Sequence, residues 1–282
     1  MKKDILTLQE NLLGWGKNNP RMLPWRKNVG DPYLILIAEL LLKRTTASAV
    51  ARLFPIFIEK YPTVQHLNNS NLEHLAKDLS PIGLNNQRAV SMKKMAEYIV
   101  QNHEGNIPKQ YEELLKLPGL GQYGARAMMS FAYGKPMAIV DSNVVRIFRR
   151  VFKELSKLNF DYGSYQPIAD KILPKSDHRS FNLALLDLGS LICKPVRPKC
   201  KICPLTDFCN YSQTGPHELL AKLNEDSLGL RKLRIKKGLS LLKLSEMSGV
   251  AKSTILNMES GKTRPRPQTL ERLDQVLSSY IF

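Results

Sequence analysis

The amino-acid sequence predicts an all-α protein. Apolar residues recur with helical spacing in one segment after another, whereas no segment shows the apolar–polar alternation that is typical of a strand. The composition, with 43% hydrophobic and only 7% aromatic residues, suits a helical protein with real apolar cores. Its 282 residues are enough for one large or two to three small domains.

Each expected helix is an apolar-periodic segment that is bounded by Pro, Gly or capping residues. We expect no internal repeat. The helices are expected at residues 4–17, 32–44, 46–60, 71–79, 87–103, 109–116, 122–133, 142–154, 165–173 and 179–192, with a further short helix at 217–224.

The helix that follows Asp31 is apolar nearly all round, so we expect it at the centre of a domain. Glu39 interrupts its apolar run. One interpretation is a surface residue at the edge of a buried face. The other is a buried acid that lines a pocket, where desolvation would raise its pKa and allow it to donate a proton.

The charge of the chain points to a polyanionic partner. Its 42 Lys and Arg residues against 25 Asp and Glu residues give a formal net charge of +17, which favours nucleic acid or an anionic membrane surface. No run of about eighteen apolar residues suggests a membrane span. The N-terminal residues lack the character of a signal peptide, so the cytoplasm is the expected compartment.

All four cysteines lie close together near residue 200, at Cys193, Cys200, Cys203 and Cys209. Their spacing leaves six, two and five residues between successive cysteines. Four thiolates in so short a segment suit a [4Fe–4S] cluster or zinc, although four cysteines could also pair as disulfides in three ways. Zinc ribbons more often use two Cys-x2-Cys pairs, and only one such pair is present here.

A glycine-rich turn separates two expected helices at Leu117-Pro-Gly-Leu-Gly-Gln-Tyr-Gly-Ala125. Pro118 favours the turn, and its glycines permit positive φ angles or close approach. Such a turn can direct main-chain N–H groups at a phosphate, or it can be an ordinary corner between helices. Asp141 follows the second helix.

Taken together, the cysteine spacing, the glycine-rich turn and Asp141 resemble the endonuclease III superfamily of DNA glycosylases. The resemblance covers about residues 20–211. It implies a six-helix barrel at 26–135 and a helical iron–sulfur domain built from 1–25 and 136–211, with the four cysteines as ligands of a [4Fe–4S] cluster. It also implies that the hairpin, with Gly119 and Gly121, holds a DNA phosphate without reading sequence, and that the target nucleotide flips out of the duplex.

The resemblance also assigns catalytic roles. Asp141 occupies the position of the carboxylate that stabilises positive charge on the deoxyribose and activates water. Glu39 lies where relatives keep an acid for the departing base. Bifunctional relatives have a lysine at the position of Tyr123, where it forms a Schiff base. Since tyrosine cannot do so, we expect a monofunctional glycosylase without strand cleavage.

Two subfamilies share the segment Leu23-Pro-Trp-Arg26 and the acid in the early helix. The segments 38–46, 82–89 and 121–123 are similar to thymine-DNA mismatch glycosylases, which remove T or U opposite G, and they depart from the adenine glycosylases that act opposite 8-oxoguanine. The resemblance implies that Arg44 and the loop Leu84, Asn85, Asn86 and Gln87 enter the base stack and contact the orphan guanine, and that Lys43 also binds DNA. A simpler alternative is that Lys43 and Arg44 only neutralise phosphate.

The C-terminal part has a different composition. After an expected linker at 212–227, residues 228–282 contain 11 Lys and Arg residues against 4 Asp and Glu residues. Helices expected at 230–237, 241–248, 251–259 and 268–280 resemble a lambda-repressor-type helix-turn-helix, with Leu233, Leu244, Met247, Val250, Ile255, Leu270 and Leu273 in its core. Its second helix would present Lys252, Ser253, Thr254 and Asn257 to the major groove, unless the module serves protein contacts.

The sequence therefore predicts a monomeric, cytoplasmic and nucleoid-associated glycosylase for T or U mispaired with G in double-stranded DNA. The helix-turn-helix would add DNA affinity or direct the enzyme to sites of a cytosine methyltransferase. An adenine glycosylase acting opposite 8-oxoguanine or G is the alternative enzyme. A non-catalytic iron–sulfur DNA-binding regulator is the alternative of a different class.

Overall fold

The computed structural model describes residues 2–27, 30–158, 161–195, 198–214, 227–263, 266, 269–270, 272–273 and 276–277. Every regular element in these ranges is a helix, so the all-α prediction is confirmed. The chain divides into two compact units, one formed by Met1–Val145 with Phe160–Asp187 and the other by Arg146–Asn159 with Leu188–Phe282. None of the helices described is long and apolar enough to cross a membrane.

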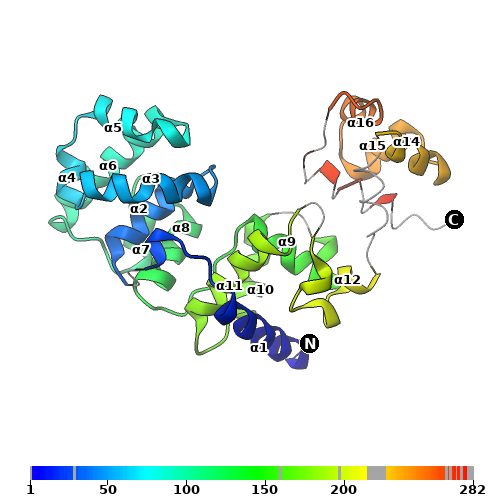
Figure 1. Cartoon of the computed structure of the whole chain (residues 1–282), viewed down its shortest axis with the longest axis horizontal. Coiled ribbons are helices and arrows are strands. Elements are labelled where there is room, and N and C mark those ends of the chain that lie inside the picture. Colours follow the sequence, from blue (N-terminus) through cyan, green and yellow to red (C-terminus); the bar gives the residue numbers. More distant parts are fainter. Residues whose placement is uncertain are drawn as a thin grey trace. The chain divides into compact units, whose positions relative to one another are not determined.

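The first unit is built around α2 (Pro32–Leu42), the nearly all-apolar helix that was expected at the centre. Asp31 caps its N-terminus by accepting hydrogen bonds from the main-chain N–H groups of Tyr33 and Leu34, at 2.9 and 3.2 Å. Figure 1 shows α2 surrounded by neighbouring helices, and it packs against α3, α6 and α8. The helices of this unit are α1 (Lys2–Asn18), α2, α3 (Ala47–Lys60), α4 (Val64–Asn69), α5 (Leu72–Leu79), α6 (Asn85–His103), α7 (Tyr111–Lys116), α8 (Gln122–Ala127) and α10 (Tyr162–Ile172).

The structure differs from the expected helices at a few places. The short helix α4 was not expected, and it forms because the Thr63 hydroxyl caps it by accepting from the N–H of His66. The helix expected at 122–133 is α8 followed by a π-helical turn at Met128–Ala132. The helix expected at 142–154 is α9 (Ser142–Val151), followed by a 3-10 helix at Lys153–Lys157.

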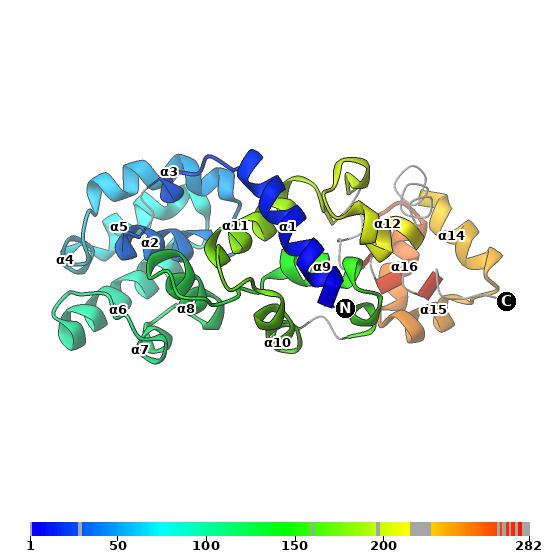
Figure 2. The ribbon, with the colours of Figure 1, turned by 90° about the horizontal axis from the view of Figure 1, so that it is seen from below.

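Helix α1 lies against α11 (His178–Leu191), as Figure 2 shows. The contact is close at Gly16, where an added Cβ atom would meet the Cβ of Ala184 at 2.6 Å. Gly14, on the same helix, has open space at the equivalent position. Gly16 therefore allows the two helices to approach.

Gly16→Ala should destabilise the protein by about 1–3 kcal/mol, because overpacking forces helices apart. Gly14→Ala is the matched control, and we expect it to stabilise α1 by about 0.5–1 kcal/mol because alanine favours helix. Urea unfolding of both variants measures the difference. Equal stability of the two variants would contradict the close α1–α11 contact.

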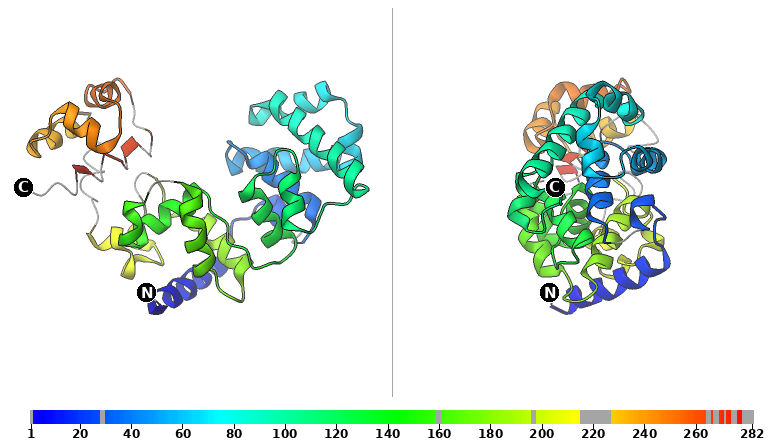
Figure 3. Two further views of the ribbon diagram at one scale, coloured as in Figure 1. Left: turned by 180° about the vertical axis from the view of Figure 1, so that it is seen from behind. Right: turned by 90° about the vertical axis from the view of Figure 1, so that its left-hand side faces the viewer.

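The second unit contains the predicted helix-turn-helix, with α14 (Ser227–Lys236), α15 (Leu241–Ser248) and α16 (Lys252–Glu259). Figure 3 shows these three helices close together, and their buried apolar residues form one core. Ser240 caps α15 by accepting from the N–H of Lys243 at 3.0 Å, and Gly249, with φ of 64°, ends it. A buried ion pair joins α14 to α16, because Arg234 binds Glu259 through two hydrogen bonds of 2.7 and 2.9 Å.

The prediction that Met247 lies in the core of this module is wrong. Met247 is 40% exposed, because the buried face of α15 is formed by Leu244 and Ser248. Around the helix axis, Met247 lies on the far side of Leu244 from Ser248, about 60° from the first and about 100° from the second. Leu244, Val250, Ile255, Leu270 and Leu273 are buried as expected, and Leu233 packs partly buried against them. The helix expected at 217–224 and most of the linker at 212–227 lie outside the described residues, and the helix expected at 268–280 is described only in part.

Candidate active site and DNA-facing surfaces

Three elements of the first unit bring the predicted catalytic residues together. Glu39 lies on α2, Tyr123 lies in the first turn of α8, and Asp141 immediately precedes α9. Their charges act on one another, since Asp141 raises the pKa of Glu39, and both carboxylates raise the pKa of Tyr123. Residues that lie 18 to 102 positions apart thus share one small site.

The Asp141 carboxylate is held by the first turn of α9. Its Oδ1 accepts hydrogen bonds from the main-chain N–H groups of Asn143 and Val144, both at 2.9 Å. Its Oδ2 accepts from the side-chain Nδ2 of Asn143 at 2.6 Å. These donors orient both oxygens, and Oδ2, which accepts only one of these three hydrogen bonds, keeps a lone pair for another partner. The local sequence Asp-Ser-Asn favours this arrangement because aspartate is a preferred N-cap.

Glu39 is surrounded by protein but keeps part of its surface accessible. Burial, followed by the negative charge of Asp141, raises its pKa to about 8, whereas the positive charge of Arg26 lowers it. Glu39 is therefore mainly protonated at neutral pH. The second interpretation of this residue, a buried acid able to donate a proton, agrees with its surroundings.

Tyr123 is half-buried and packs against the apolar core of the first unit. Burial, then the charges of Glu39 and Asp141, raise its pKa well above the usual value of a phenol. Tyr123 therefore stays a neutral phenol that can donate or accept a hydrogen bond. It lacks the amine that is needed to form an imine with the sugar.

Arg26 is a further member of this site that the sequence did not single out. It follows Trp25, which is buried in the core of the unit. Its guanidinium holds Asp187 of α11 through two hydrogen bonds of 2.7 and 2.9 Å, and Arg21 donates its main-chain N–H to the same carboxylate at 3.3 Å. The positive charge of Arg26 lowers the pKa of Glu39 and of Tyr123, and so opposes the larger effects of burial and of the neighbouring carboxylates.

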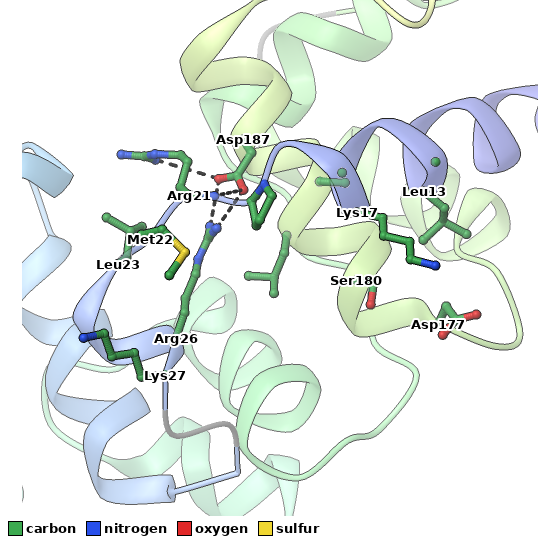
Figure 4. A pocket seen from close by; sticks show the side chains of 15 residues that line it. Leu13, Lys17, Arg21, Met22, Leu23, Arg26, Lys27, Asp177, Ser180 and Asp187 are labelled. Carbon is green, nitrogen blue, oxygen red and sulfur yellow. Dashed lines mark hydrogen bonds and ion pairs between the residues drawn. The ribbon is translucent and has the colours of Figure 1, made fainter.

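A cavity of about 730 Å³ lies beside this ion pair, and Figure 4 shows Arg26 and Asp187 on its wall. Most of the other polar groups on the wall are basic. The cavity is lined by Leu13, Gly14, Gly16, Lys17, Pro20, Arg21, Met22, Leu23, Arg26, Lys27, Asp177, Ser180, Leu183, Ala184 and Asp187.

Asp187, which is only 2% exposed, was likewise not predicted as a site residue. The available signal was a carboxylate inside the apolar run Leu183-Ala-Leu-Leu-Asp-Leu-Gly189, the same kind of signal that pointed to Glu39. Its partner Arg26 follows two prolines and lies 161 positions earlier, so no local pattern connects them.

The predicted DNA-facing residues lie on exposed loops of the first unit. Lys43 and Arg44 follow α2 and are exposed, and Leu84 precedes α6 with 42% of its surface exposed. Asn86 and Gln87 are exposed and Asn85 is half-buried. Arg44 and Leu84 both have left-handed backbone conformations, with φ of 55° and 53°, which cost about 1–3 kcal/mol each in residues other than glycine.

The glycine-rich turn connects α7 to α8 as a short hairpin. Gly119 has φ of 85°, and an added Cβ atom would lie 2.2 Å from the Oγ of Ser91, so glycine is required there. Gly121 precedes α8 and is exposed like Gly119, and the Nζ of Lys43 donates a hydrogen bond to the Gly119 carbonyl. The ammonium group of Lys43 is therefore bound to the hairpin.

The four predicted ligand cysteines lie in the second unit, after α11 and before α12 (Asn210–Thr214). Within the described stretches 161–195 and 198–214, the structure arranges no group of three or more Cys, His, Asp or Glu side chains around a metal position. The thiols nevertheless act on one another: burial, followed by the charges of Cys193, Cys209 and Cys200, raises the pKa of Cys203, to about 12. Four cysteines in one short segment have the donor chemistry that zinc or an iron–sulfur cluster requires.

Helix α9 supplies the residues that hold the first cysteine. Arg150 donates to the Sγ of Cys193 at 3.4 Å and to the carbonyl of Lys194 at 2.7 Å, and Arg146 donates to the carbonyl of Cys193 at 2.9 Å. The main chain of Arg150 accepts from the Sγ of Cys209 at 3.4 Å. The cysteine segment is thus anchored to a buried basic face of α9.

On the helix-turn-helix, α16 presents a mixed surface. Lys252 and Ser253 are exposed, whereas Thr254 and Asn257 are half-buried. The exposed set also includes Leu256, with 50% of its surface accessible, which the sequence analysis did not select.

Comparison with known proteins agrees with this architecture. Residues 37–157 match the HhH-GPD superfamily base excision DNA repair protein model, and residues 230–279 match a helix-turn-helix model. The chain is 37% identical over 201 residues to a thymine/uracil-DNA glycosylase of Methanothermobacter thermautotrophicus, which covers 71% of this chain and 90% of that protein. It is 31% identical over 211 residues to an adenine DNA glycosylase of Mycobacterium tuberculosis, covering 73% of this chain and 67% of that protein.

A solved structure described as a thermostable thymine-DNA glycosylase superposes with a TM-score of 0.72 at 35% identity, covering 75% of this chain and 98% of that one. The family model, which matches residues 37–157, spans the glycine-rich turn and Asp141. The chain therefore belongs to the HhH-GPD superfamily of base excision DNA repair proteins, and it carries a C-terminal helix-turn-helix module.

Proposed function

We propose that the protein is a monofunctional DNA glycosylase that removes thymine or uracil mispaired with guanine. The observation that carries this proposal is the assembly of Glu39, Tyr123 and Asp141 in one site, with a neutral tyrosine where bifunctional relatives have a lysine. The similarity to a thymine/uracil-DNA glycosylase over most of its length supports the choice of base.

In the proposed reaction, the mispaired nucleotide flips out of the duplex and its C1′–N bond breaks as the base leaves. Positive charge then develops on the deoxyribose. The Asp141 carboxylate, oriented by the N–H groups of Asn143 and Val144, stabilises that charge and accepts a proton from the water that adds to C1′. The products are the free base and an abasic site.

The departing base carries negative charge unless it receives a proton or hydrogen bonds. Glu39, which is mainly protonated at neutral pH, can supply the proton. Asp141 and Glu39 thus take complementary roles, because the surroundings of Glu39 favour its neutral form, whereas Asp141 acts as the carboxylate. Tyr123 completes the site as a hydrogen-bonding phenol, so the DNA strand stays intact.

The proposed arrangement places a [4Fe–4S] cluster on Cys193, Cys200, Cys203 and Cys209. When bound, such a cluster cross-links the cysteine segment and fixes its basic residues for contact with phosphate. The proposed domains are a barrel at 26–135 and a cluster domain formed by 1–25 and 136–211, followed by the linker 212–227 and the module 228–282. A brown preparation with absorbance near 400 nm is expected for iron–sulfur and not for zinc.

A base-release assay tests the proposed activity. Duplexes that contain G·T, G·U or A·8-oxoguanine are incubated with the full chain, and each sample is divided before treatment with alkali. We expect strand breaks from G·T and G·U only after alkali. Breaks only from A·8-oxoguanine would establish the adenine glycosylase alternative, breaks without alkali would refute monofunctional action, and no release from any duplex would favour the non-catalytic regulator.

For the helix-turn-helix, we propose that α16 lies in the major groove and adds double-stranded DNA affinity to a monomeric enzyme at the chromosome. The exposed Lys252 and Ser253, with the half-buried Thr254 and Asn257, would make these contacts. A preference for sites of a cytosine methyltransferase would place the enzyme where deamination creates T opposite G. The preference is refuted if the full chain excises thymine equally at all sites, or if truncation after residue 215 leaves excision unchanged.

A further inference from the structure

Two of the exposed residues proposed to enter the DNA stack are held in unusual backbone conformations. Arg44 and Leu84 both have positive φ angles, and both lie on the exposed surface of the first unit. They belong to different loops, one after α2 and one before α6. A strained loop keeps its shape only when surrounding contacts determine it. The contacts that determine these two loops converge on one side chain.

That side chain is Arg88, which lies in the first turn of α6 and is 7% exposed. Its Nε donates to the carbonyl of Gly83, next to Leu84, at 2.9 Å. Its Nη1 donates to the carbonyls of Leu40 and Leu41 at 2.9 and 3.2 Å, and its Nη2 donates to the carbonyl of Lys43. One guanidinium therefore binds the residues that directly precede both strained positions.

The geometry requires arginine. Only a guanidinium offers several N–H donors in a fixed planar fork, and here different nitrogens of the fork serve different loops. The carbonyls of α2 are those of its last turn, which lack partners within the helix. Burial removes water from the guanidinium and lowers the pKa of Arg88. The main-chain carbonyls replace that water as hydrogen-bond acceptors.

A second contact extends the same network to the hairpin. Lys43, whose carbonyl accepts from Arg88, donates its own Nζ to the carbonyl of Gly119. The loop with Arg44, the loop with Leu84 and the glycine-rich turn are thus connected through hydrogen bonds within one unit. A phosphate held at the turn would have a defined position relative to the two residues that enter the stack.

We propose that Arg88 is a positioning residue that fixes Arg44 and Leu84 at a set spacing, so that both enter the duplex together when the mispaired nucleotide leaves it. This inference rests on the proposed glycosylase function. Arg88 itself does not contact DNA, because its guanidinium is buried against main-chain carbonyls. It acts by keeping two separate loops in one rigid arrangement, which lowers the cost of inserting them.

The test compares Arg88→Met and Arg88→Lys with Lys93→Met. Lys93 is a matched control, since it lies on the same helix and also donates to main-chain carbonyls, those of Asn68 and Ser70, but away from the DNA-facing loops. A 2-aminopurine beside a G·T mispair reports unstacking when residues enter the duplex. Excision at saturating enzyme, duplex affinity and thermal unfolding are measured on the same full-length proteins.

For Arg88→Met we expect the 2-aminopurine signal to be lost and excision at saturating enzyme to fall by about 10- to 100-fold, the usual effect of misplacing a reacting group. Arg88→Lys should behave similarly, because one amine keeps the charge but cannot bridge two loops. Lys93→Met should keep both signals. Should Arg88→Met fail to fold, Arg88→Lys carries the same comparison.

Two outcomes would overturn the proposal. Wild-type behaviour of Arg88→Lys would mean that only the charge matters, and slow excision with an intact 2-aminopurine signal would mean that Arg88 acts through the helix of Glu39 instead of the loops. A wild-type protein that releases no base would refute the proposed function. The 2-aminopurine signal of the three variants would still test the positioning role in that case.

Discussion

Asp141→Asn should lower the rate of base excision by about 10²- to 10⁴-fold, the largest effect that we expect from any single substitution. The amide can still accept the main-chain hydrogen bonds of Asn143 and Val144, so α9 should keep its cap. What is lost is the negative charge next to the developing positive charge on the sugar, together with the group that takes a proton from water. Single-turnover excision of thymine from a G·T duplex measures the change.

The control for this prediction is Asp170→Asn. Asp170 pairs with Arg126 in the same unit, so the change removes one carboxylate and one ion pair without touching the proposed reaction. We expect both variants to bind a G·T duplex like the wild type, and only Asp141→Asn to lose excision. Excision by Asp141→Asn at the rate of Asp170→Asn would exclude the proposed role of Asp141.

Glu39→Gln should lower excision at neutral pH by about 10²-fold or more, because glutamine can hydrogen-bond to the departing base but cannot protonate it. The pH dependence follows from the raised pKa of about 8. An acid of that pKa is active below pH 8 and loses its proton as the pH rises through 8, so wild-type excision at saturating enzyme should decline on the alkaline side. Glu39→Gln should lack that decline.

Glu112→Gln, on the exposed face of α7, is the matched control, and it should retain both the rate and the alkaline decline. Rates are measured between pH 5 and 10 with enzyme in excess, so that binding does not limit them. An alkaline decline that persists in Glu39→Gln would assign the titration to another group. A flat wild-type profile would mean that the departing base needs no proton from the protein.

Much of the fold was predictable because its signals are local. The helical spacing of apolar residues, the prolines, and caps such as Asp31 and Ser240 act within a few positions, so they specify helices in the sequence itself. The errors arose where tertiary contacts decide. Met247 has the right residue type for a core but the wrong angular position on α15, and the π-helical turn after α8 has no local signature.

The candidate site divides in the same way. Residue type and order along the chain were sufficient to propose Glu39, Tyr123 and Asp141, because the hairpin, the aspartate and the cysteine spacing resemble a known family. Arg26 and Asp187 were missed, since an ion pair across 161 positions leaves no periodic trace in either segment. The same is true of Arg88, which resembles any other basic residue at the start of a helix until its carbonyl partners are seen.

The all-α class, the family and the helix-turn-helix could be predicted from the residues alone, and the two acids could be proposed from them, because these features depend on spacing along the chain. The protonation of Glu39 and the connection between the two DNA-facing loops follow from the folded arrangement instead. The pKa of Glu39 depends on burial and on the charges of Asp141 and Arg26, which come from distant segments. The loops of Arg44 and Leu84 depend on a buried guanidinium from a third element. Electrostatic energies and hydrogen bonds depend on distances in space, and the folded chain alone sets those distances.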